Sequence, residues 1–258
     1  MKKSSHLPAG FAVALASLLA ADLAFAQDAP LNIHSWVSST GTGSACTRAA
    51  PCASFATAQN ATVPGGVVSV LDPGDYGPPF IITKSLTIRA EGVDGGSIVN
   101  SGTGFLISVT AGASDVVTLE GLHFSRAGGV QFNSGGQLHV VRCSIVGGTA
   151  AGIAGISFQP NSLSKLSVTD TLISSMGSGG IVINPRSGGS ARVNLERVTV
   201  NGNNFGIRVD GTGSTTGINM TIANSMIGGQ LCGRDICHHA GRWTADSDSG
   251  QEHRVREQ

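Results

Sequence analysis

An eight-residue pattern that recurs along most of the chain constrains the fold more than any other feature. Apolar residues occupy its first, third and eighth places, and the clearest copies have polar residues at the second and fourth places. Alternation of period two over short runs predicts strands, and a unit repeated every few tens of residues predicts a solenoid. The last four copies start at almost equal intervals, and the six copies begin at Leu86, Val117, Leu138, Leu166, Val193 and Met220.

A second pattern, glycine followed by apolar, any and apolar residues, lies between successive copies of the first. It recurs at almost equal intervals, from Gly129 through Gly155 and Gly180 to Gly206. Helical repeats need longer periodic runs without glycine, and leucine-rich repeats need spaced leucines with a fixed Asn or Cys. Two clear strands and a short third side per turn therefore predict an all-β fold, a right-handed parallel β-helix of roughly six coils.

The N-terminal segment, positions 1–26, has the layout of a secretory signal peptide. Lys2 and Lys3 form a charged region, residues 11–20 an apolar region, and Ala24-Phe-Ala26 an Ala-x-Ala cleavage site. An uncleaved anchor is the alternative, although the apolar run is short for a membrane span. We expect a secreted, periplasmic or cell-surface protein with a β-helix domain at residues 27–229 and no stable membrane span after signal removal.

Composition agrees with a stacked β-solenoid and removes one class of partner. The chain has 37 glycines and only 12% charged residues, which suits many tight turns. Its formal net charge is zero. The electrostatic reason to expect nucleic acid or an anionic membrane as a partner is therefore missing.

The N-terminal part of the domain contains a cysteine pair and the one helix-like segment. Cys46 and Cys52 predict a disulfide that closes a small loop, the alternative being a free or metal-bound pair. Residues 51–62 predict a helix with Pro51 in its first turn, after an edge strand at residues 36–38. We expect this helix to cover the open end of the solenoid, because terminal turns expose apolar columns and unpaired backbone.

The segment that follows carries a resemblance to a known family. After Gly65-Gly66 come an apolar strand at residues 67–71, the turn Asp72-Pro-Gly-Asp-Tyr76, and strands at residues 80–82 and 86–90. In this order the chain resembles the pectate-lyase-like, right-handed parallel β-helix superfamily, over about residues 36–229. It looks most like exported bacterial β-helix-repeat proteins of unassigned activity. The resemblance implies a fold, and a fold alone does not determine function.

Members of that superfamily often cut or de-esterify acidic polysaccharides, but their catalytic sets are not found in this sequence. Asn-Thr-Asp, Asp-Asp, Gly-His-Gly and Arg-Ile-Lys do not occur, nor does a clustered acidic site for calcium. We therefore expect a non-catalytic glycan-binding or structural envelope protein, with polysaccharide as the partner and no cofactor or metal. The alternative is a polysaccharide lyase or hydrolase with a diverged site.

Stacking of equivalent places suggests two candidate binding features. At the fifth place, Arg142, Asp170 and Arg197 alternate in charge on successive coils, as an anion or sugar-acid site or as a salt-bridge ladder. At the fourth place, Arg89 and Glu120 should be cross-strand neighbours able to form an ion pair. The second place forms a polar strip that either binds glycan or is an ordinary hydrated face, and it comprises Thr87, Thr118, His139, Ser167, Asn194 and Thr221.

Three further features are weaker candidates. Asp72, Asp75 and Tyr76 share a turn, where carboxylates and an aromatic ring can bind sugar or calcium, although turns favour Asp for backbone reasons alone. His139, one coil from His123, is a candidate general base without an evident nucleophile. The sixth-place cysteine of the third copy, at residue 143, is expected to be a lone packing thiol.

The character of the sequence changes after Gly229, and residues 230–258 form an atypical tail. Gly-rich alternation stops, and no further Gly-apolar strand appears near residue 232. The tail predicts an irregular cap with a Cys232–Cys237 disulfide, a disordered or out-of-frame terminus, or a zinc site that adds His238 or His239 to the two cysteines.

Overall fold

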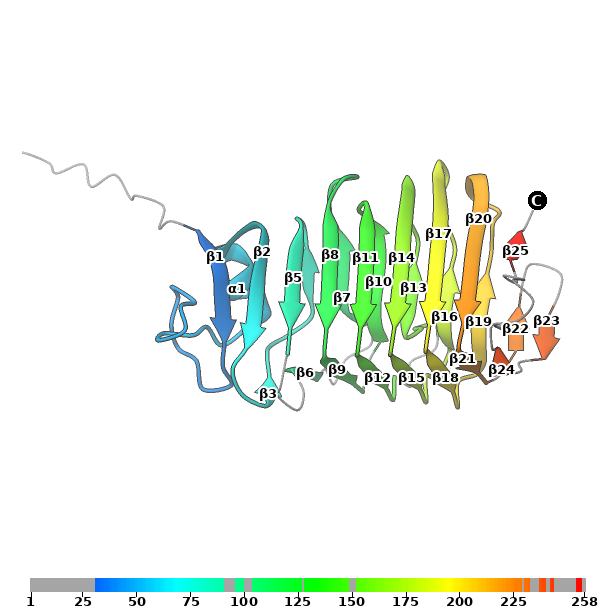
Figure 1. Ribbon diagram of the computed structural model, residues 1–258. Helices are drawn as coiled ribbons and strands as arrows, with labels where there is room; N and C mark the ends of the chain where they lie inside the picture. Colours follow the sequence, from blue (N-terminus) through cyan, green and yellow to red (C-terminus); the bar gives the residue numbers. More distant parts are fainter. Residues whose placement is uncertain are drawn as a thin grey trace, which may run out of the picture.

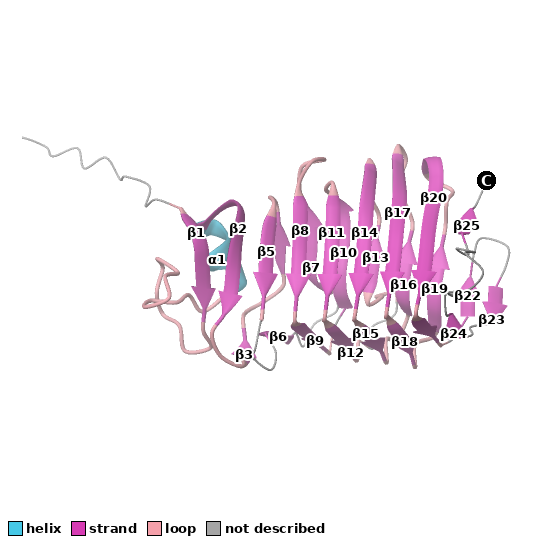
Figure 2. Cartoon of the chain, viewed as in Figure 1, coloured by secondary structure: helices cyan, strands magenta, loops and turns pink. Residues whose placement is uncertain are grey.

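The protein is a parallel β-solenoid of about seven turns, in which each turn contributes one strand to each of three sheets (Figures 1 and 2). The structure, a computed structural model, describes residues 31–90, 96–99, 104–126, 128–148, 152–228, 230–232, 237–239, 242–243 and 254–256. The predicted signal peptide lies outside the described residues. Among the described residues, no helix has the length and apolar character needed to cross a membrane.

Sheet A forms the side of the solenoid that faces the viewer in Figure 1. Its strands, in spatial order, are β1 (Asn32–Val37), β2 (Thr62–Val70), β5 (Leu86–Arg89), β8 (Val116–Glu120), β11 (Gln137–Val141), β14 (Leu163–Thr169), β17 (Gly189–Glu196), β20 (Ser214–Ala223) and β25 (Arg254–Arg256).

Sheets B and C complete each turn. Sheet B consists of β3 (Gly74–Asp75), β6 (Gly96–Val99), β9 (Leu122–Ser125), β12 (Ser144–Val146), β15 (Leu172–Ser174), β18 (Thr199–Asn201), β21 (Ser225–Ile227) and β24 (Arg242–Trp243). Sheet C consists of β4 (Phe80–Ile82), β7 (Phe105–Thr110), β10 (Gly128–Ser134), β13 (Ile156–Phe158), β16 (Gly179–Ile183), β19 (Phe205–Val209), β22 (Gln230–Cys232) and β23 (Cys237–His239).

The strand register confirms both sequence repeats. In sheet A, Leu166 pairs with Leu138 on one side and with Val193 on the other. In sheet C, Ile156 pairs with Val130 and with Ile181, so the second pattern is also in line. The solenoid has about seven turns where roughly six were expected, because β2 opens a further turn without carrying a full copy of the pattern. The right-handed sense of the coil stays a prediction.

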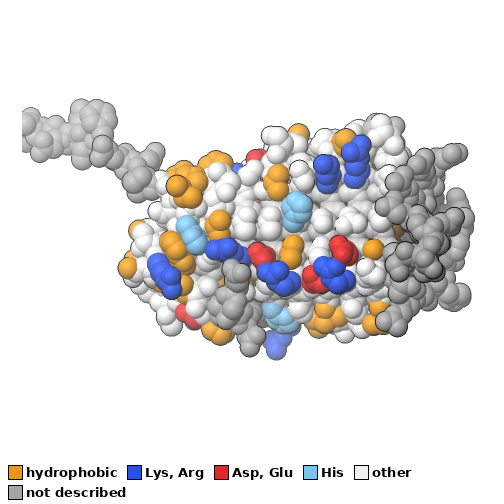
Figure 3. Space-filling view, viewed as in Figure 1, with side chains coloured by type: hydrophobic (Ala, Val, Ile, Leu, Met, Phe, Trp, Pro, Cys, Tyr) orange, Lys and Arg blue, Asp and Glu red, His pale blue; other side chains and the backbone are white. Residues whose placement is uncertain are grey.

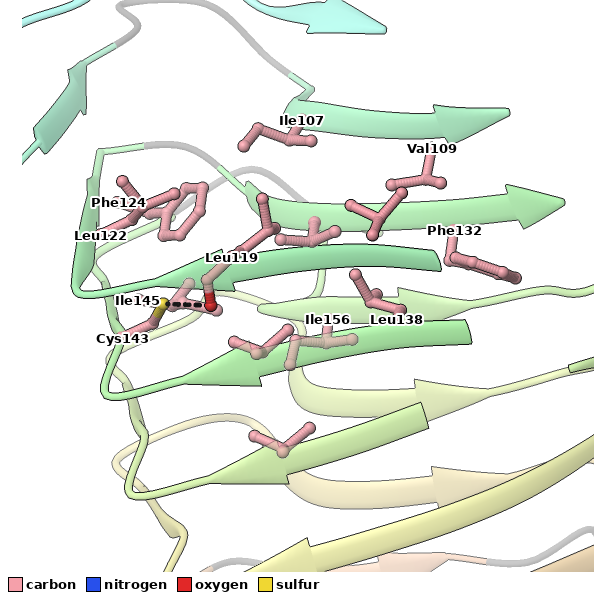
Figure 4. Close-up of a cluster of buried hydrophobic side chains, with 14 of the residues drawn as sticks. Ile107, Val109, Leu119, Leu122, Phe124, Phe132, Leu138, Cys143, Ile145 and Ile156 are labelled. Carbon is pink, nitrogen blue, oxygen red and sulfur yellow. Dashed lines mark hydrogen bonds between the residues drawn. The ribbon is translucent and has the colours of Figure 1, made fainter. Parts of the chain in front are cut away.

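The interior is a set of stacked apolar columns. The described residues at the first, third and eighth places point inward, as Figure 4 shows for Leu119, Leu138, Phe124 and others. The rings of Phe132 and Phe158 stack in neighbouring turns with their centroids 4.6 Å apart. Burial of these columns is the main driving force for folding.

The fifth place of the eight-residue pattern is a left-handed bend between sheets A and B. Its backbone φ is 51° at Arg142, 50° at Asp170, 53° at Arg197 and 51° at Asn224. Each such residue directly follows the last residue of a sheet A strand, and a strand of sheet B begins one or two positions further along. The eight-residue pattern is therefore two strands joined by a corner. The corner turns the three charged side chains out to the solvent.

The glycine of the second pattern stands where a side chain has no room. A Cβ atom would lie 2.4 Å from Gly155 O if placed at Gly129, and 2.4 Å from Ile173 Cγ2 if placed at Gly155. At Gly180 it would lie 2.3 Å from Val200 Cγ1. These glycines allow the entry to sheet C to pack against the sheet B column, which explains the second repeat.

The helix α1 (Phe55–Ala61) is shorter than predicted and begins later. Ser54 is its N-cap, and the Ser54 hydroxyl accepts a hydrogen bond of 3.2 Å from Thr57 N. The placement of Pro51 in the first helical turn was therefore wrong, because the capping serine three residues later sets the start. Phe55 and Ala58 are buried as expected, and α1 packs against β1, β2 and β4. Its role as a cap stays a prediction.

The predicted disulfide between Cys46 and Cys52 is present. Cys143, the free cysteine of the described region, is buried in the core as predicted, and its thiol donates to Leu119 O at 3.5 Å and to Val141 O at 3.4 Å.

The tail continues the sheets where the sequence showed no strand. β22 pairs in parallel with β19, at the place where the repeat was judged to stop. β23, β24 and β25 then pair antiparallel with β22, β21 and β20. The side chains of Cys232, Cys237, His238 and His239 lie outside the described part of the structure, so the disulfide and zinc alternatives stay predictions.

Candidate functional site

The outer face of sheet A carries a continuous line of polar side chains, here called the polar row. Its members stand in direct cross-strand register on six neighbouring strands from β5 to β20. All six are half-buried or exposed at the surface. The polar row comprises Thr87, Thr118, His139, Ser167, Asn194 and Thr221.

The polar row has unused hydrogen-bonding capacity. Within the described part of the chain, none of its six side chains has a hydrogen-bond partner. Hydroxyl, amide and imidazole groups each offer both donors and acceptors. Neighbouring strands of a sheet are about 4.8 Å apart, so the row is a ladder of hydrogen-bonding groups at a regular spacing.

His139 lies in the middle of the polar row, between Thr118 and Ser167. Burial, and then the positive charge of Lys165, lower the pKa of His139 below its ordinary value. His139 is therefore neutral at pH 7. His123 belongs to β9 in sheet B, so the two histidines lie on different sheets. The role of His139 as a general base stays a prediction.

Two cations flank the polar row, and the sequence reasoning missed them. Lys165 of β14 and Arg192 of β17 are direct register neighbours, and both are exposed. Neither has an ion-pair partner among the residues that the structure describes. Figure 3 shows two basic side chains together on this face, apart from the acidic ones. Both stand one place before the start of the repeat, so the same alignment would have revealed them.

The fifth-place charges form a ladder below the polar row. Arg197 donates to Asp170 from Nε at 2.6 Å and from Nη2 at 3.0 Å, and it also pairs with Glu196. Arg142 pairs with Glu120 on the preceding turn. The hydrogen bond from Arg197 lowers the pKa of Asp170. The predicted alternation is present. Asp170 and Arg197 pair with each other and Arg142 pairs with the fourth-place Glu120, which favours the structural alternative. The binding role stays a prediction.

The predicted neighbours Arg89 and Glu120 are in direct register on β5 and β8. Glu120 accepts from Arg142, and Arg89 donates from Nε to Ser69 Oγ at 3.2 Å. Arg89 therefore also reaches back toward β2.

The turn of Asp72 and Tyr76 is held together internally. The Tyr76 ring is buried, with 1% of its surface exposed, and its hydroxyl donates to Asp72 Oδ1 at 2.6 Å. Asp72 also accepts from Ser38 Oγ at 2.5 Å and from Ser39 N at 2.7 Å. Burial disfavours the charged carboxylate, but these hydrogen bonds outweigh it and lower the pKa of Asp72 to about 2.

This arrangement gives Asp72 and Tyr76 a structural use, since they join the turn to the end of β1. Burial and the Asp72 carboxylate raise the pKa of Tyr76 above its ordinary value. Asp75 is exposed and accepts from Gly77 N at 3.3 Å. A sugar or calcium site at this turn stays a prediction that these contacts do not favour.

An aromatic pair at the N-terminal end of the same face was also missed. The rings of His34 and Trp36 are stacked with centroids 3.9 Å apart, and His34 Nε2 lies 2.8 Å from Ser69 Oγ. Burial, and then Arg89 and Arg48, lower the pKa of His34. The pair lies at alternate residues of an edge strand, a spacing that places two side chains on one face. Half-buried aromatic rings can stack against sugar rings.

No metal site emerges from the described residues. Among them, no group of three or more His, Cys, Asp or Glu side chains is placed to hold a metal ion.

Comparisons of the chain with known protein families, curated proteins and solved structures found no match.

Proposed function

We propose that the protein binds a polysaccharide along the outer face of sheet A and does not cleave it. The observation that carries this proposal is the polar row, whose side chains have no hydrogen-bond partner among the described residues. A polymer lying across the strands can place successive hydroxyl groups against successive members of the row, because both the ligand and the row are periodic.

The charge on this face favours a negatively charged polysaccharide. Lys165 and Arg192 are adjacent, exposed and without an ion-pair partner in the described region. The chain as a whole has a formal net charge of zero, so the attraction is local to this face. Because the Debye length at physiological ionic strength is about 8 Å, we expect the affinity to fall as salt is raised.

The resemblance of the sequence to the pectate-lyase-like superfamily supports the choice of polysaccharide as ligand. Export through the predicted signal peptide is part of the proposal, since it would bring the protein to such polymers. A purely structural role at the envelope and a diverged lyase or hydrolase are the competing functions, and the following experiment separates them.

Binding of the purified protein to polygalacturonate, alginate and neutral dextran would be measured by isothermal titration calorimetry. We expect binding to the acidic polymers, weakened at least about tenfold by Lys165→Gln combined with Arg192→Gln. The matched control is Arg208→Gln, which removes an exposed positive charge from sheet C. Ser167→Ala combined with Asn194→Ala should weaken binding without altering the charge.

Three results would contradict the proposal. Absence of binding to every polymer would favour the structural role. An equal loss in the sheet A and Arg208 variants would mean that the attraction is not local to this face. New reducing ends or unsaturated products after incubation would establish the enzymatic alternative instead.

A further inference from the structure

The outer edge of β1 is the N-terminal limit of sheet A. In the sheet order β1 is the terminal strand, with β2 on its inner side. The backbone N–H and C=O groups of Val37 point toward β2, because the Val37 carbonyl accepts a hydrogen bond of 2.9 Å from Leu71 N. Backbone groups alternate along a strand, so those of Trp36 and Ser38 face outward. An outward row of backbone donors and acceptors is a template for pairing with another chain.

The loop closed by Cys46 and Cys52 occupies this edge. Trp36 N donates to Cys46 O at 2.8 Å, and Cys52 N donates to Trp36 O at 3.0 Å. Ser38 N donates to Cys52 O at 3.0 Å, and Val37 and Cys52 form an isolated parallel bridge. Both ends of the disulfide therefore take part in covering β1. The edge is paired by a short loop that the disulfide closes.

We propose that the outer edge of β1 is an interaction surface for a second copy of this chain, and that the Cys46–Cys52 loop is a redox-sensitive guard that keeps it occupied. Reduction by a dithiol breaks the S–S bond, converts both cysteines to thiols and oxidises the dithiol to its own disulfide. The reduced loop is then held to β1 by these backbone hydrogen bonds, by a hydrogen bond of 2.7 Å from Asn32 Nδ2 to Ala45 O, and by the burial of both cysteine side chains. We expect these contacts to open once the covalent link is broken.

The partner is a second copy in two-fold, antiparallel β1-to-β1 contact. At the opposite end of the solenoid, β23, β24 and β25 pair with the last strand of each sheet. Head-to-tail stacking would have to displace those strands, whereas a two-fold contact uses only the β1 edge and closes upon itself. Two apolar side chains beside that edge would be buried by the contact, since Leu31 is 49% and Ile33 78% exposed.

The test compares the wild-type protein with the Cys46→Ser/Cys52→Ser variant by size-exclusion chromatography with light scattering, over a hundredfold range of concentration. We expect the oxidised wild-type protein to be monomeric and the variant to form dimers reversibly as concentration rises. In dilute solution, the amide protons of Trp36 and Ser38 should exchange at least about tenfold faster in the variant, and dimer formation should protect them again.

Two further variants make the result specific. Ile33→Lys added to the double serine variant should restore the monomer, because a lysine beside a strand edge opposes pairing. Cys143→Ser removes a buried thiol away from β1 and should leave the protein monomeric. Reduction of the wild-type loop, in a Cys232→Ser/Cys237→Ser background, should reproduce the dimer without any change at Cys46 or Cys52.

The proposal fails if the folded double variant stays monomeric throughout, or if it grows into filaments, which would require a head-to-tail contact. Loss of the native circular dichroism spectrum both in that variant and in the reduced wild-type loop would also overturn it. The loop would then be required for the fold and not act as a guard.

Discussion

The guanidinium of Arg197 holds the carboxylate of Asp170, on the preceding turn, through two hydrogen bonds of 2.6 and 3.0 Å. Both residues stand at the left-handed corner between sheets A and B. These two turns thus contact each other at the corner through side chains as well as through the backbone, where Asp170 N donates to Glu196 O.

Replacing Arg197 should raise the pKa of Asp170 toward its ordinary value. The hydrogen bond from Arg197 is the largest cause of the depressed pKa. A carboxyl group with a depressed pKa in the folded state stabilises the protein above its unfolded pKa of about 3.9, and that contribution is lost as the pH falls below it. Titration of the Asp170 carboxyl by NMR in Arg197→Gln measures the change. Arg192→Gln is the control, and an equal rise in both variants would refute the assignment.

Substitution of a corner residue by asparagine should change the stability little, whereas substitution by a β-branched residue should lower it. Arg142 has φ of 51°, a region that costs an ordinary side chain roughly 1–2 kcal/mol. We expect Arg142→Asn to change the free energy of unfolding by less than about 1 kcal/mol, because relief of strain offsets the exposed ion pair. Arg142→Val should destabilise by about 1–2 kcal/mol. Urea unfolding compares the two variants, and equal stability would show that backbone strain is not the determinant.

A methyl group at Gly155 should strongly destabilise the solenoid. Its Cβ would lie 2.4 Å from Ile173 Cγ2 and 2.9 Å from Gly180 O, so both the core and the neighbouring turn must shift. Overpacking of this kind costs about 2–3 kcal/mol. Gly65→Ala is the control, since a Cβ there meets nothing within 4 Å and costs only backbone strain of about 1 kcal/mol. Thermal unfolding that ranks the two variants in the opposite order would contradict the steric explanation.

The Asp72–Tyr76 contact should make stability depend on pH in acid. The pKa of Asp72 is lowered to about 2, so its contribution is complete above the ordinary value near 3.9 and disappears as the pH falls from about 4 to 2. Because the carboxylate is partly solvated, we expect a contribution on the order of 1 kcal/mol. Urea unfolding between pH 2 and 7 should show a smaller acid loss in Asp72→Asn. Tyr76→Phe should cost about 1 kcal/mol at pH 7.

Binding of an acidic polysaccharide should strengthen as the pH falls through the lowered pKa of His139. Burial and Lys165 keep this imidazole neutral at pH 7, and its protonation below pH 6.5 adds a positive charge to the polar row. Calorimetric titrations should show a higher affinity for the polysaccharide at pH 5 than at pH 7 in the wild-type protein. This increase in affinity should be absent in His139→Gln. In Lys165→Gln, the increase in affinity should occur at a higher pH. An identical pH dependence of affinity in all three proteins would exclude His139 as the cause of the increase.

The arrangement of the strands could be predicted from the sequence, because each turn of a stacked solenoid buries residues at the same places of the repeat. Leu138 and Leu166 were aligned by their place in the repeat, and the strands pair them directly. A short turn was expected here, but the left-handed backbone at Arg142 was not, because its side chain gives no sign of positive φ where Asn or Gly would. The start of α1 was misplaced for a similar reason: Pro51 and Ser54 are both plausible starts, and tertiary contacts decide between them.

Only part of the candidate site could be predicted from the sequence. The polar row followed from the repeat, whereas Lys165 and Arg192 lie one place before the start of the repeat, a position that was not aligned between copies. The internal use of Tyr76 could not be foreseen, because it depends on Ser38 and Ser39, which lie far earlier in the chain. The stack of His34 on Trp36 depends on the position of Ser69 in the adjacent strand.

The in-register stacking of turns has a mechanical consequence. Between Leu166 and its partner Val193 the chain makes one complete turn, yet the two strands lie side by side. A fully extended chain spans about 3.3–3.6 Å per residue, so each turn stores about 90 Å of contour length in one strand spacing. If the solenoid is pulled from its two ends, it should yield one turn at a time, with a sawtooth of force peaks separated by about that length.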